Sequence, residues 1–353
     1  MPIFTDPVFV CESTDALFSF LREKKKAVPC LLAVADENTA HALSVFQNDA
    51  VVCDTLILPA GFSPDEQACR LIMEKLSEKF YDAVIACGTQ TLHDTLAFCA
   101  ASREIPMISA PTAATSDAFL SETADMIWRG QWHRESVSPP VALFKNRDII
   151  ASAPEKLTAS GCVVLLSHHL SLLEKKLDSQ VSGKPLPDGL PREEASLAAL
   201  ERFLDRKADG ILTKTESASF PLWLLDQLLS FDSPREDTVS RLAMLWRKEE
   251  AVGKNHLYGE VLGVAALTLC RMIHDSLPKK LMASPSIGKY TAVRLCAEIE
   301  RLIPSGKLEN DLKKLHFPTT PEELGLPAGE AFPKSARNEI IEASELLRKI
   351  LFS

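Results

Sequence analysis

Short apolar runs alternate with amphipathic stretches over the first 150 residues of the chain. Four runs have the length and continuity of buried parallel strands, and helical spacing of apolar residues follows the first three. The predicted strands are 29–36, 51–58, 83–87 and 106–110, and the predicted helices are 38–46, 63–79 and 91–101. Repeated strand–helix–strand units predict a Rossmann-like, doubly wound parallel sheet, which binds ligands at the carboxyl ends of its strands. The candidate ligand-binding loops are therefore 35–39, 88–91 and 111–121.

Helical spacing dominates the chain after about residue 155. The predicted helices there are 160–177, 192–204, 219–230, 237–249, 257–274, 290–302 and 338–351. Two segments rich in Pro and Gly, 183–192 and 317–332, are predicted to be connectors. We therefore expect a fold of the α/β plus all-α class. Its Rossmann-like domain would cover residues 1–155, and an all-helical domain would cover residues 156–353.

Composition excludes several classes of protein. With 353 residues, 46% hydrophobic and 25% charged, the chain has the profile of an ordinary globular protein. A net charge of −9 without a basic stripe argues against nucleic acid as a partner. No segment approaches the ~20 apolar residues of a membrane helix, and the N-terminus lacks the pattern of a signal peptide. The 9 cysteines form no CxxC pair and lie mostly in apolar runs, as expected in a reducing compartment. We expect no membrane contact and a cytoplasmic location.

Gly88 stands between a buried strand and a helix, in the sequence VIACGTQTLHD. Free backbone N–H groups at such a junction can bind a phosphate, although a single glycine there is more often a tight turn. Asp36 follows the first predicted strand, where a carboxylate can bind a ribose hydroxyl. The same position suits an aspartate that begins a turn with Asn38, and the sequence leaves both interpretations open.

The loop at residues 108–121 reads ISAPTAATSDAFLS and resembles the PTAxSxDGxxS segment of the iron-containing alcohol dehydrogenase and dehydroquinate synthase superfamily. Four more segments resemble superfamily patterns in the same order along the chain. They are VIACGTQTLHD at 84–94 (GSGTxxD), ASGCVVLLSHHL at 159–170 (AGCGDLIS), LYGEVLG at 257–263 (LHGExxG) and LKKLHFPTTPEELGL at 312–326 (PTTxxELG). The branch that these motifs resemble most is sn-glycerol-1-phosphate dehydrogenase.

This resemblance implies a dehydroquinate synthase-like fold and an NAD(P)-dependent dehydrogenase that reduces dihydroxyacetone phosphate. It also implies NAD or NADP as cofactor, a polyol phosphate or nucleotide as the small-molecule partner, and a homo-oligomer. By the same resemblance, Asp117 contacts the substrate. Together with Asp36, the candidate cofactor-binding residues are Gly88, Thr89, Thr91, Asp94, Thr112, Thr115 and Ser121.

The chain differs from the superfamily at the positions of the metal ligands. Its members hold one divalent metal with an Asp and two His of the helical domain, and these positions fall on Val164, Tyr258 and, in the best register, Met244. No His occurs between His169 and His256, so a shifted register supplies no ligand. Val, Met and Tyr are poor ligands for a hard or borderline divalent ion, so we expect the metal to be absent.

Two hypotheses therefore remain. In the first, the chain is a metal-free homologue without classical dehydrogenase activity that still binds a nucleotide or sugar phosphate. Gln90 and Ala97, which replace a loop glycine and a lysine of the superfamily, favour it. In the second, the chain is an active NAD(P)-dependent oxidoreductase on a small polyol or polyol phosphate. Its chemistry would use Tyr258 to stabilise an oxyanion and His256 or His168 to relay the proton. Alternatively, it would use a relocated metal on His168, His256 and Asp117.

Overall fold

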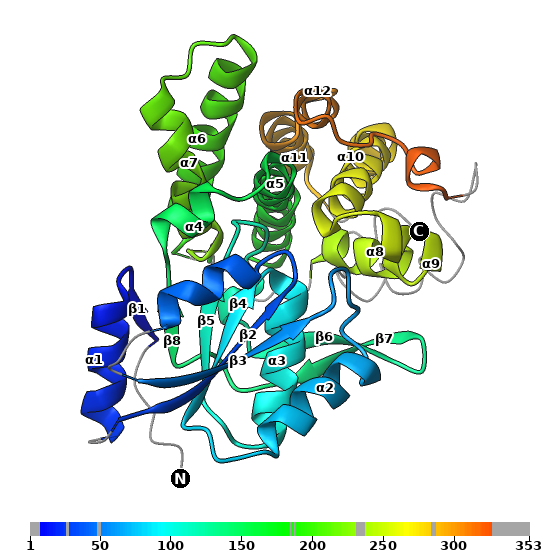
Figure 1. Ribbon diagram of the computed structural model, residues 1–353. Coiled ribbons are helices and arrows are strands. Elements are labelled where there is room, and N and C mark those ends of the chain that lie inside the picture. The colour runs from blue at the N-terminus through cyan, green and yellow to red at the C-terminus, as the bar shows by residue number, and fades with distance from the viewer. Residues whose placement is uncertain are drawn as a thin grey trace. The chain divides into compact units, whose positions relative to one another are not determined.

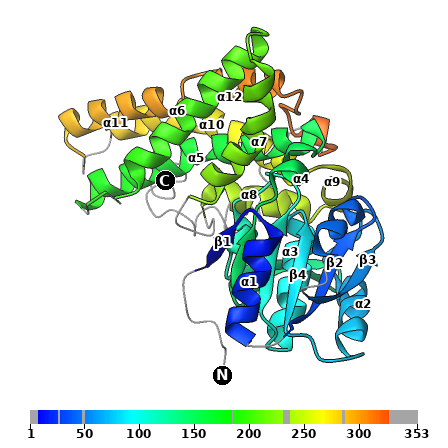
Figure 2. The same cartoon turned by 60° about the vertical axis from the view of Figure 1, so that its left-hand side comes forward.

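The computed structural model describes residues 8–25, 28–47, 51–183, 185–186, 188–230, 237–283 and 287–326. The chain forms two compact units, which we call the sheet unit and the helical unit (Figures 1 and 2). The sheet unit comprises Met1–Thr158 and Thr215–Ser230, and the helical unit comprises Ala159–Lys214 and Phe231–Ser353. The domain boundary expected between residues 155 and 156 stays a prediction.

A six-stranded parallel sheet forms the centre of the sheet unit, in the order β1-β8-β5-β4-β2-β3 (Figure 1). The strands are β1 (Phe9–Cys11), β2 (Cys30–Asp36), β3 (Val52–Leu58), β4 (Ala83–Gly88), β5 (Met107–Pro111) and β8 (Ala142–Phe144). An antiparallel hairpin, β6 (Thr123–Trp128) and β7 (Gln131–Ser136), lies outside this sheet. The chain steps from β2 outward to β3 and then crosses to β4 on the other side of β2. The topological switch point therefore lies between β2 and β4, where open α/β sheets bind their ligands.

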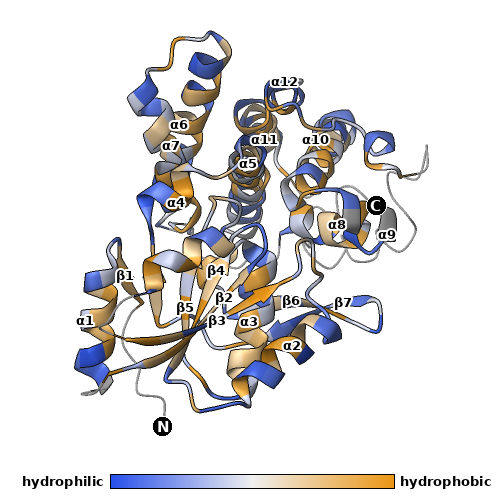
Figure 3. Cartoon of the chain, in the orientation of Figure 1, coloured by the Kyte–Doolittle hydropathy of each residue, from blue (hydrophilic) through white to orange (hydrophobic). Residues whose placement is uncertain are grey.

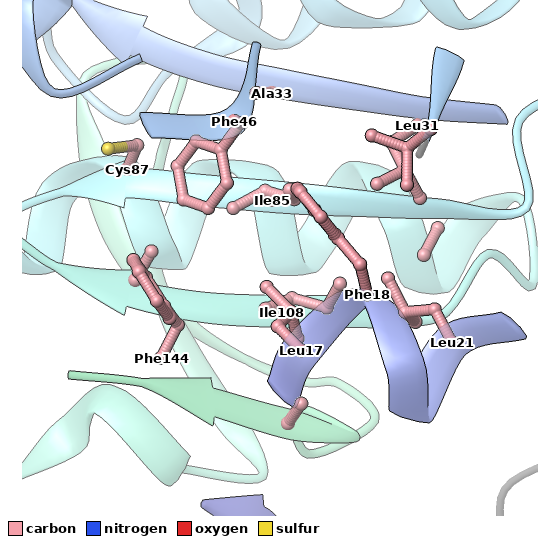
Figure 4. Close-up of a cluster of buried hydrophobic side chains, with 14 of the residues drawn as sticks. Leu17, Phe18, Leu21, Leu31, Ala33, Phe46, Ile85, Cys87, Ile108 and Phe144 are labelled. Carbon is pink, nitrogen blue, oxygen red and sulfur yellow. The ribbon is translucent and has the colours of Figure 1, made fainter. Parts of the chain in front are cut away.

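Helices pack on both faces of this sheet, which confirms the doubly wound arrangement. The helices of the sheet unit are α1 (Thr14–Lys25), η1 (Ala40–Phe46), α2 (Glu66–Leu76), α3 (Gln90–Ser102), η2 (Ala118–Leu120), α4 (Arg147–Ala151) and α7 (Lys214–Leu228), which lies in this unit from Thr215 onward. Phe18 of α1 and Phe46 of η1 pack against Ile85 on one face (Figure 4). Ile72 of α2 and Leu96 of α3 belong to the cluster on the other face. Because successive strand residues point to opposite faces, strands buried on both sides are apolar throughout, as β4 is in Figure 3.

The helical unit contains α5 (Glu155–Ser182) from Ala159 onward, α6 (Leu190–Ala208), α8 (Thr238–Arg247), α9 (Glu250–Asn255), α10 (Tyr258–Ala283), α11 (Lys289–Leu302), α12 (Lys307–Lys314) and η3 (Glu322–Leu324). Residues 155–180 of α5 are long and apolar enough to cross a membrane by length and composition alone, and 78% of the most apolar window is buried inside the protein. The expectation that no segment approaches this composition was therefore wrong for α5. A helix surrounded by packing partners is apolar on most of its faces, which explains its composition without a membrane.

Most predicted elements match the structure to within a few residues. Residues 38–46 differ, since a 3-10 helix begins only at Ala40, after a turn that starts at Asp36. Helix α2 begins at Glu66 because Asp65 accepts hydrogen bonds from the N–H groups of Gln67 and Ala68. The three-residue strands β1 and β8 and the helices α1, α4, α9 and α12 were not predicted. The predicted helix 338–351 lies outside the described residues.

Candidate functional site

The carboxyl ends of β2 and β4 are joined by one threonine. The hydroxyl of Thr39 lies 2.8 Å from Oδ1 of Asp36 and 3.0 Å from the backbone oxygen of Cys87. The N–H of Thr39 also donates to Oδ1 of Asp36, at 2.8 Å. Asp36 therefore holds the turn that follows β2, with Thr39 in place of the predicted Asn38. The contact of Asp36 with a ribose stays a prediction.

Gly88 ends β4 in close contact with the helix that follows. A Cβ atom at Gly88 would lie 2.7 Å from Cδ2 of Leu92, so the absence of a side chain lets α3 begin directly at the strand end. Thr89 is the N-cap residue of α3, but its side chain makes no capping hydrogen bond and the first turn holds no acidic residue. By contrast, the side chain of Asp65 caps α2.

The N-terminus of α3 consequently offers backbone N–H groups to a ligand. The N–H groups of Leu92 and His93 bond to the oxygen of Thr89, and those of Gln90 and Thr91 have no partner among the described residues. The partial positive charge of a helix N-terminus adds to the attraction for an anion. This tip lies beside the switch point, where a dinucleotide diphosphate binds in folds of this class.

The segment 112–121 runs along the same carboxyl edge. The N–H of Thr112 donates to the oxygen of Gly88 at 3.1 Å, which joins this segment to the end of β4. Ser121 is engaged locally, since its Oγ accepts from the N–H of Thr123 at 3.0 Å. Asp117 is half-buried at the N-cap position of η2.

Two buried polar atoms near this edge lack hydrogen-bond partners within the described part of the chain, Nε2 of His93 and Oγ1 of Thr115. Burial without a partner costs about 1–3 kcal/mol for such a group, and a ligand or an ordered water would remove that cost. With the uncapped N-terminus of α3, these orphaned atoms fit the polar groups of a dinucleotide. The fold thus brings the predicted cofactor-binding residues and Asp117 to the segments that end or follow β2, β4 and β5. Their contacts with a cofactor or substrate stay predictions.

The positions that the resemblance assigns to the metal lie in the helical unit. Val164 is fully buried in α5 and has no donor atom. Sδ of Met244 lies 4.0 Å from Nη1 of Arg247, and the guanidinium carbon of Arg247 lies 5.4 Å from the centre of the Tyr258 ring. A permanent positive charge therefore contacts two of the three positions, and it would repel a divalent cation there. An aliphatic side chain, a thioether and a phenol beside this charge do not fit the metal of the superfamily.

His168 and His256, the histidines proposed for a relocated metal, belong to no cluster of metal-ligating side chains among the described residues. His256 is in extended conformation between α9 and α10, and its Nδ1 lies 3.7 Å from Oε2 of Glu260. His168 is buried in α5. In the described ranges, no three His, Cys, Asp or Glu side chains come together as a group that could hold a metal. The structure therefore gives the relocated site no support.

Packing explains the parts of the LYGEVLG motif that match the superfamily. A Cβ atom at Gly259 would lie 2.6 Å from the backbone oxygen of Ser160, so only glycine allows α10 to approach α5 this closely. Oε2 of Glu260 accepts from the N–H of Leu257 at 2.7 Å and satisfies the N-terminus of α10. Within this motif, Tyr258 alone stands at a position that the resemblance assigns to a metal ligand.

The helical unit also contains a cavity of about 300 Å³ between α5, α6, α10 and α12. Several of its charged groups pair with one another: Glu201 lies 3.1 Å from Nε2 of His169 and 3.3 Å from Nζ of Lys307, which also lies 3.3 Å from Asp311. None of the predicted site residues lines this cavity.

Sequence reasoning missed three residues of these sites: Thr39, His93 and Arg247. The Asp-x-x-Thr spacing is a turn signal that could have identified Thr39. Arg247 follows Met244 by three residues, so helical spacing places both on one face of α8. The sequence gives no comparable signal for His93, because its environment is created by Phe119 from another segment.

Comparisons with known proteins agree with this fold. The family described as iron-containing alcohol dehydrogenase matches residues 14–154. A glycerol-1-phosphate dehydrogenase [NAD(P)+] of Bacillus licheniformis is 35% identical over 254 residues, 69% of this chain and 61% of that enzyme. The enzyme of the same name from Methanosarcina barkeri is 24% identical over 262 residues, 72% of this chain and 64% of that enzyme. The aligned part thus spans less than two thirds of either relative.

Solved structures share the fold over nearly the whole chain. A probable glycerol dehydrogenase from Sinorhizobium meliloti has a TM-score of 0.65 at 17% identity and covers 96% of this chain and 89% of its own. A sulfoacetaldehyde reductase from Bifidobacterium kashiwanohense, solved in complex with NAD+, has a TM-score of 0.65 at 13% identity and covers 96% and 91%.

Proposed function

Because this chain belongs to the iron-containing alcohol dehydrogenase family, we propose that its sheet unit binds NAD or NADP at the carboxyl edge of the parallel sheet. The uncapped N-terminus of α3 at the switch point carries this proposal, since a diphosphate binds to free backbone N–H groups at such places. The NAD(P) dependence of the related glycerol-1-phosphate dehydrogenases supports the same cofactor class.

In this arrangement the diphosphate contacts the N–H groups of Gln90 and Thr91. Asp94, Thr112, Thr115 and Ser121 would face the nucleosides, and Asp117 would face the substrate, as the resemblance implies. The side chain of Gln90 stands where the superfamily has glycine, so binding should be weaker than with a glycine at this position. When bound, the nicotinamide ring supplies or accepts a hydride.

We further propose that the helical unit binds no catalytic metal through Val164, Met244 and Tyr258. The contact of Arg247 with both Met244 and Tyr258 carries this part, because a fixed cation excludes a second one nearby. The chain would then be a metal-free homologue that binds a dinucleotide and a small polyol phosphate without classical dehydrogenase activity.

A second candidate is an oxidoreductase that works without a metal. The same contact favours it, since the phenol of Tyr258 and the guanidinium of Arg247 are donors that could stabilise an oxyanion. We also propose that the protein is cytoplasmic and forms a homo-oligomer. Light scattering coupled to gel filtration tests the oligomeric state.

The test is to titrate NADH and NADPH into the purified protein and to assay reduction of dihydroxyacetone phosphate both with added divalent metal and with a chelator. Binding without turnover supports the metal-free homologue. Turnover that persists with the chelator and falls in Tyr258→Phe supports the second candidate. Absence of dinucleotide binding overturns both.

A further inference from the structure

His93 is a buried histidine whose protonation is fixed by one backbone contact. It lies in the first turn of α3 with 2% of its surface exposed, and its Nδ1 lies 2.9 Å from the backbone oxygen of Thr89. Because a carbonyl oxygen only accepts hydrogen bonds, Nδ1 carries the proton and Nε2 carries the lone pair. Burial lowers the pKa of His93 to about 4, so the ring is neutral at pH 7 and Nε2 can only accept.

The ring is also held in place from its other side. Its centre lies 4.8 Å from the ring centre of Phe119 at an interplanar angle of 70°, which is an edge-to-face contact. Phe119 belongs to η2, in the segment that follows β5 at the carboxyl edge of the sheet. The imidazole therefore lies between the N-terminal turn of α3 and this segment, next to the predicted diphosphate site.

The helix itself does not need a polar ring here. The oxygen of Thr89 already accepts from the N–H groups of Leu92 and His93, so loss of the Nδ1 contact leaves no acceptor unsatisfied. Meanwhile Nε2 is buried without a hydrogen-bond partner among the described residues. A leucine would fill similar space without this unsatisfied atom, so the histidine costs stability unless something bonds to Nε2.

We propose that Nε2 of His93 accepts a hydrogen bond from an N–H or O–H group of a nucleoside whose diphosphate is bound at the N-terminus of α3. This inference rests on the proposed dinucleotide binding and adds a positioning residue to it. Phosphate oxygens carry no donor at neutral pH, so the donor is a ribose hydroxyl, an adenine amine or the nicotinamide carboxamide. A fixed acceptor there orients the nucleoside relative to the segment that contains Asp117.

The experiment compares wild type with His93→Leu and His93→Gln by titration with NADH, ADP-ribose and ADP. Removing the acceptor should weaken binding of NADH about 5- to 30-fold, as expected for one hydrogen bond to a buried group. His93→Gln keeps an acceptor oxygen and should lose less. A loss for NADH alone identifies the carboxamide, a loss shared with ADP-ribose identifies the second ribose, and a loss shared with ADP identifies the adenosine.

Unfolding of the ligand-free protein in urea is the second readout. His93→Leu should be as stable as wild type or more stable, whereas a purely structural histidine would leave it less stable. Thr95→Val is the matched control, because it removes a different buried polar group of α3, a hydroxyl bonded to the oxygen of Thr91 at 2.7 Å, and should leave affinity unchanged. Unchanged NADH affinity in His93→Leu, or its failure to fold, overturns the role of His93 alone. A wild type that binds none of the three ligands overturns the proposed function as well.

Discussion

The guanidinium carbon of Arg247 lies 5.4 Å from the centre of the Tyr258 ring, which places a cation over the aromatic face. Tyr258 begins α10, and Arg247 ends α8, so the contact joins two helices of the helical unit. Such a pair stabilises a protein by about 0.5–1 kcal/mol, and here it also brings a positive charge to a position that the resemblance assigns to a metal ligand. We therefore expect this helix junction to hold no metal.

A double-mutant cycle should detect this contact. We expect Arg247→Met and Tyr258→Leu each to lower the free energy of unfolding, with a coupling of about 0.5–1 kcal/mol between them in urea denaturation. Tyr290, which is 78% exposed, provides the control, and Arg247→Met with Tyr290→Leu should be additive. Additive behaviour of the first pair would contradict the contact.

An acidic residue at the uncapped start of α3 should increase the stability of the protein and weaken its binding of NADH. We expect Thr89→Asp to raise the free energy of unfolding by about 0.5–1 kcal/mol, because it adds a cap and a favourable charge. The same charge should repel a diphosphate and weaken NADH binding at least ~10-fold, the equivalent of ~1.4 kcal/mol. As a control, Asp65→Ala should destabilise α2 by about 1 kcal/mol and leave NADH affinity unchanged. Equal NADH affinity of Thr89→Asp and wild type would show that no diphosphate binds at this helix.

Gly259 should tolerate no side chain. We expect Gly259→Ala to lower the free energy of unfolding by at least ~2 kcal/mol, because its Cβ would lie 2.6 Å from the backbone oxygen of Ser160. Gly288→Ala has no atom within 4 Å of the new Cβ and should change stability by no more than about 0.5 kcal/mol. Similar losses in both variants, measured by urea denaturation, would refute the close approach of α5 and α10.

The free energy of unfolding should fall as pH rises from the pKa of Glu174 in the unfolded chain to its pKa in the folded protein. Burial and the negative charges of Asp237 and Asp178 raise the pKa of Glu174 to about 8, against hydrogen bonds from Thr238. In the unfolded chain this carboxyl titrates at about 4.3, so between that pH and 8 only the unfolded state releases the proton. The contribution of Glu174 is therefore complete below the unfolded pKa and is lost as pH rises toward 8.

Glu174→Gln removes this titration. Relative to wild type, the variant should gain stability between pH 5 and pH 8, by an amount on the order of a few kcal/mol in urea denaturation. The exposed Glu23 is the control, and Glu23→Gln should differ from wild type by the same amount at every pH. A constant difference for Glu174→Gln would mean that Glu174 is ionised in the folded protein at neutral pH.

Much of the fold is predictable from local patterns, as β2 and α2 illustrate. Five consecutive apolar residues, all fully buried, form the centre of β2, and Asp65 marks the start of α2. Strand β1 has only three residues and depends on pairing with β8, which local sequence does not reveal. The site shows the same division. The position of Gly88 follows from the strand that precedes it, whereas the contacts of His93 with Phe119 and of Arg247 with Tyr258 join distant segments.

The PTTPEELG segment shows why a motif match need not mark a functional site. The N–H of Thr319 donates to Oε2 of Glu323 at 2.6 Å, and the N–H of Glu323 donates to Oγ1 of Thr320 at 3.3 Å. These bonds hold the turn that leads into η3, and Gly325 ends η3 with a φ of +82°. The residues of this motif are therefore explained by the local fold.

The decisive measurement is metal analysis of the purified protein after incubation with zinc, iron or nickel and desalting, with NADH titrated into the same sample. We expect NADH to bind and no stoichiometric metal to be retained, because the guanidinium of Arg247 contacts both Met244 and Tyr258. One equivalent of tightly held metal per chain would contradict the metal-free site, and absence of NADH binding would contradict the dinucleotide site.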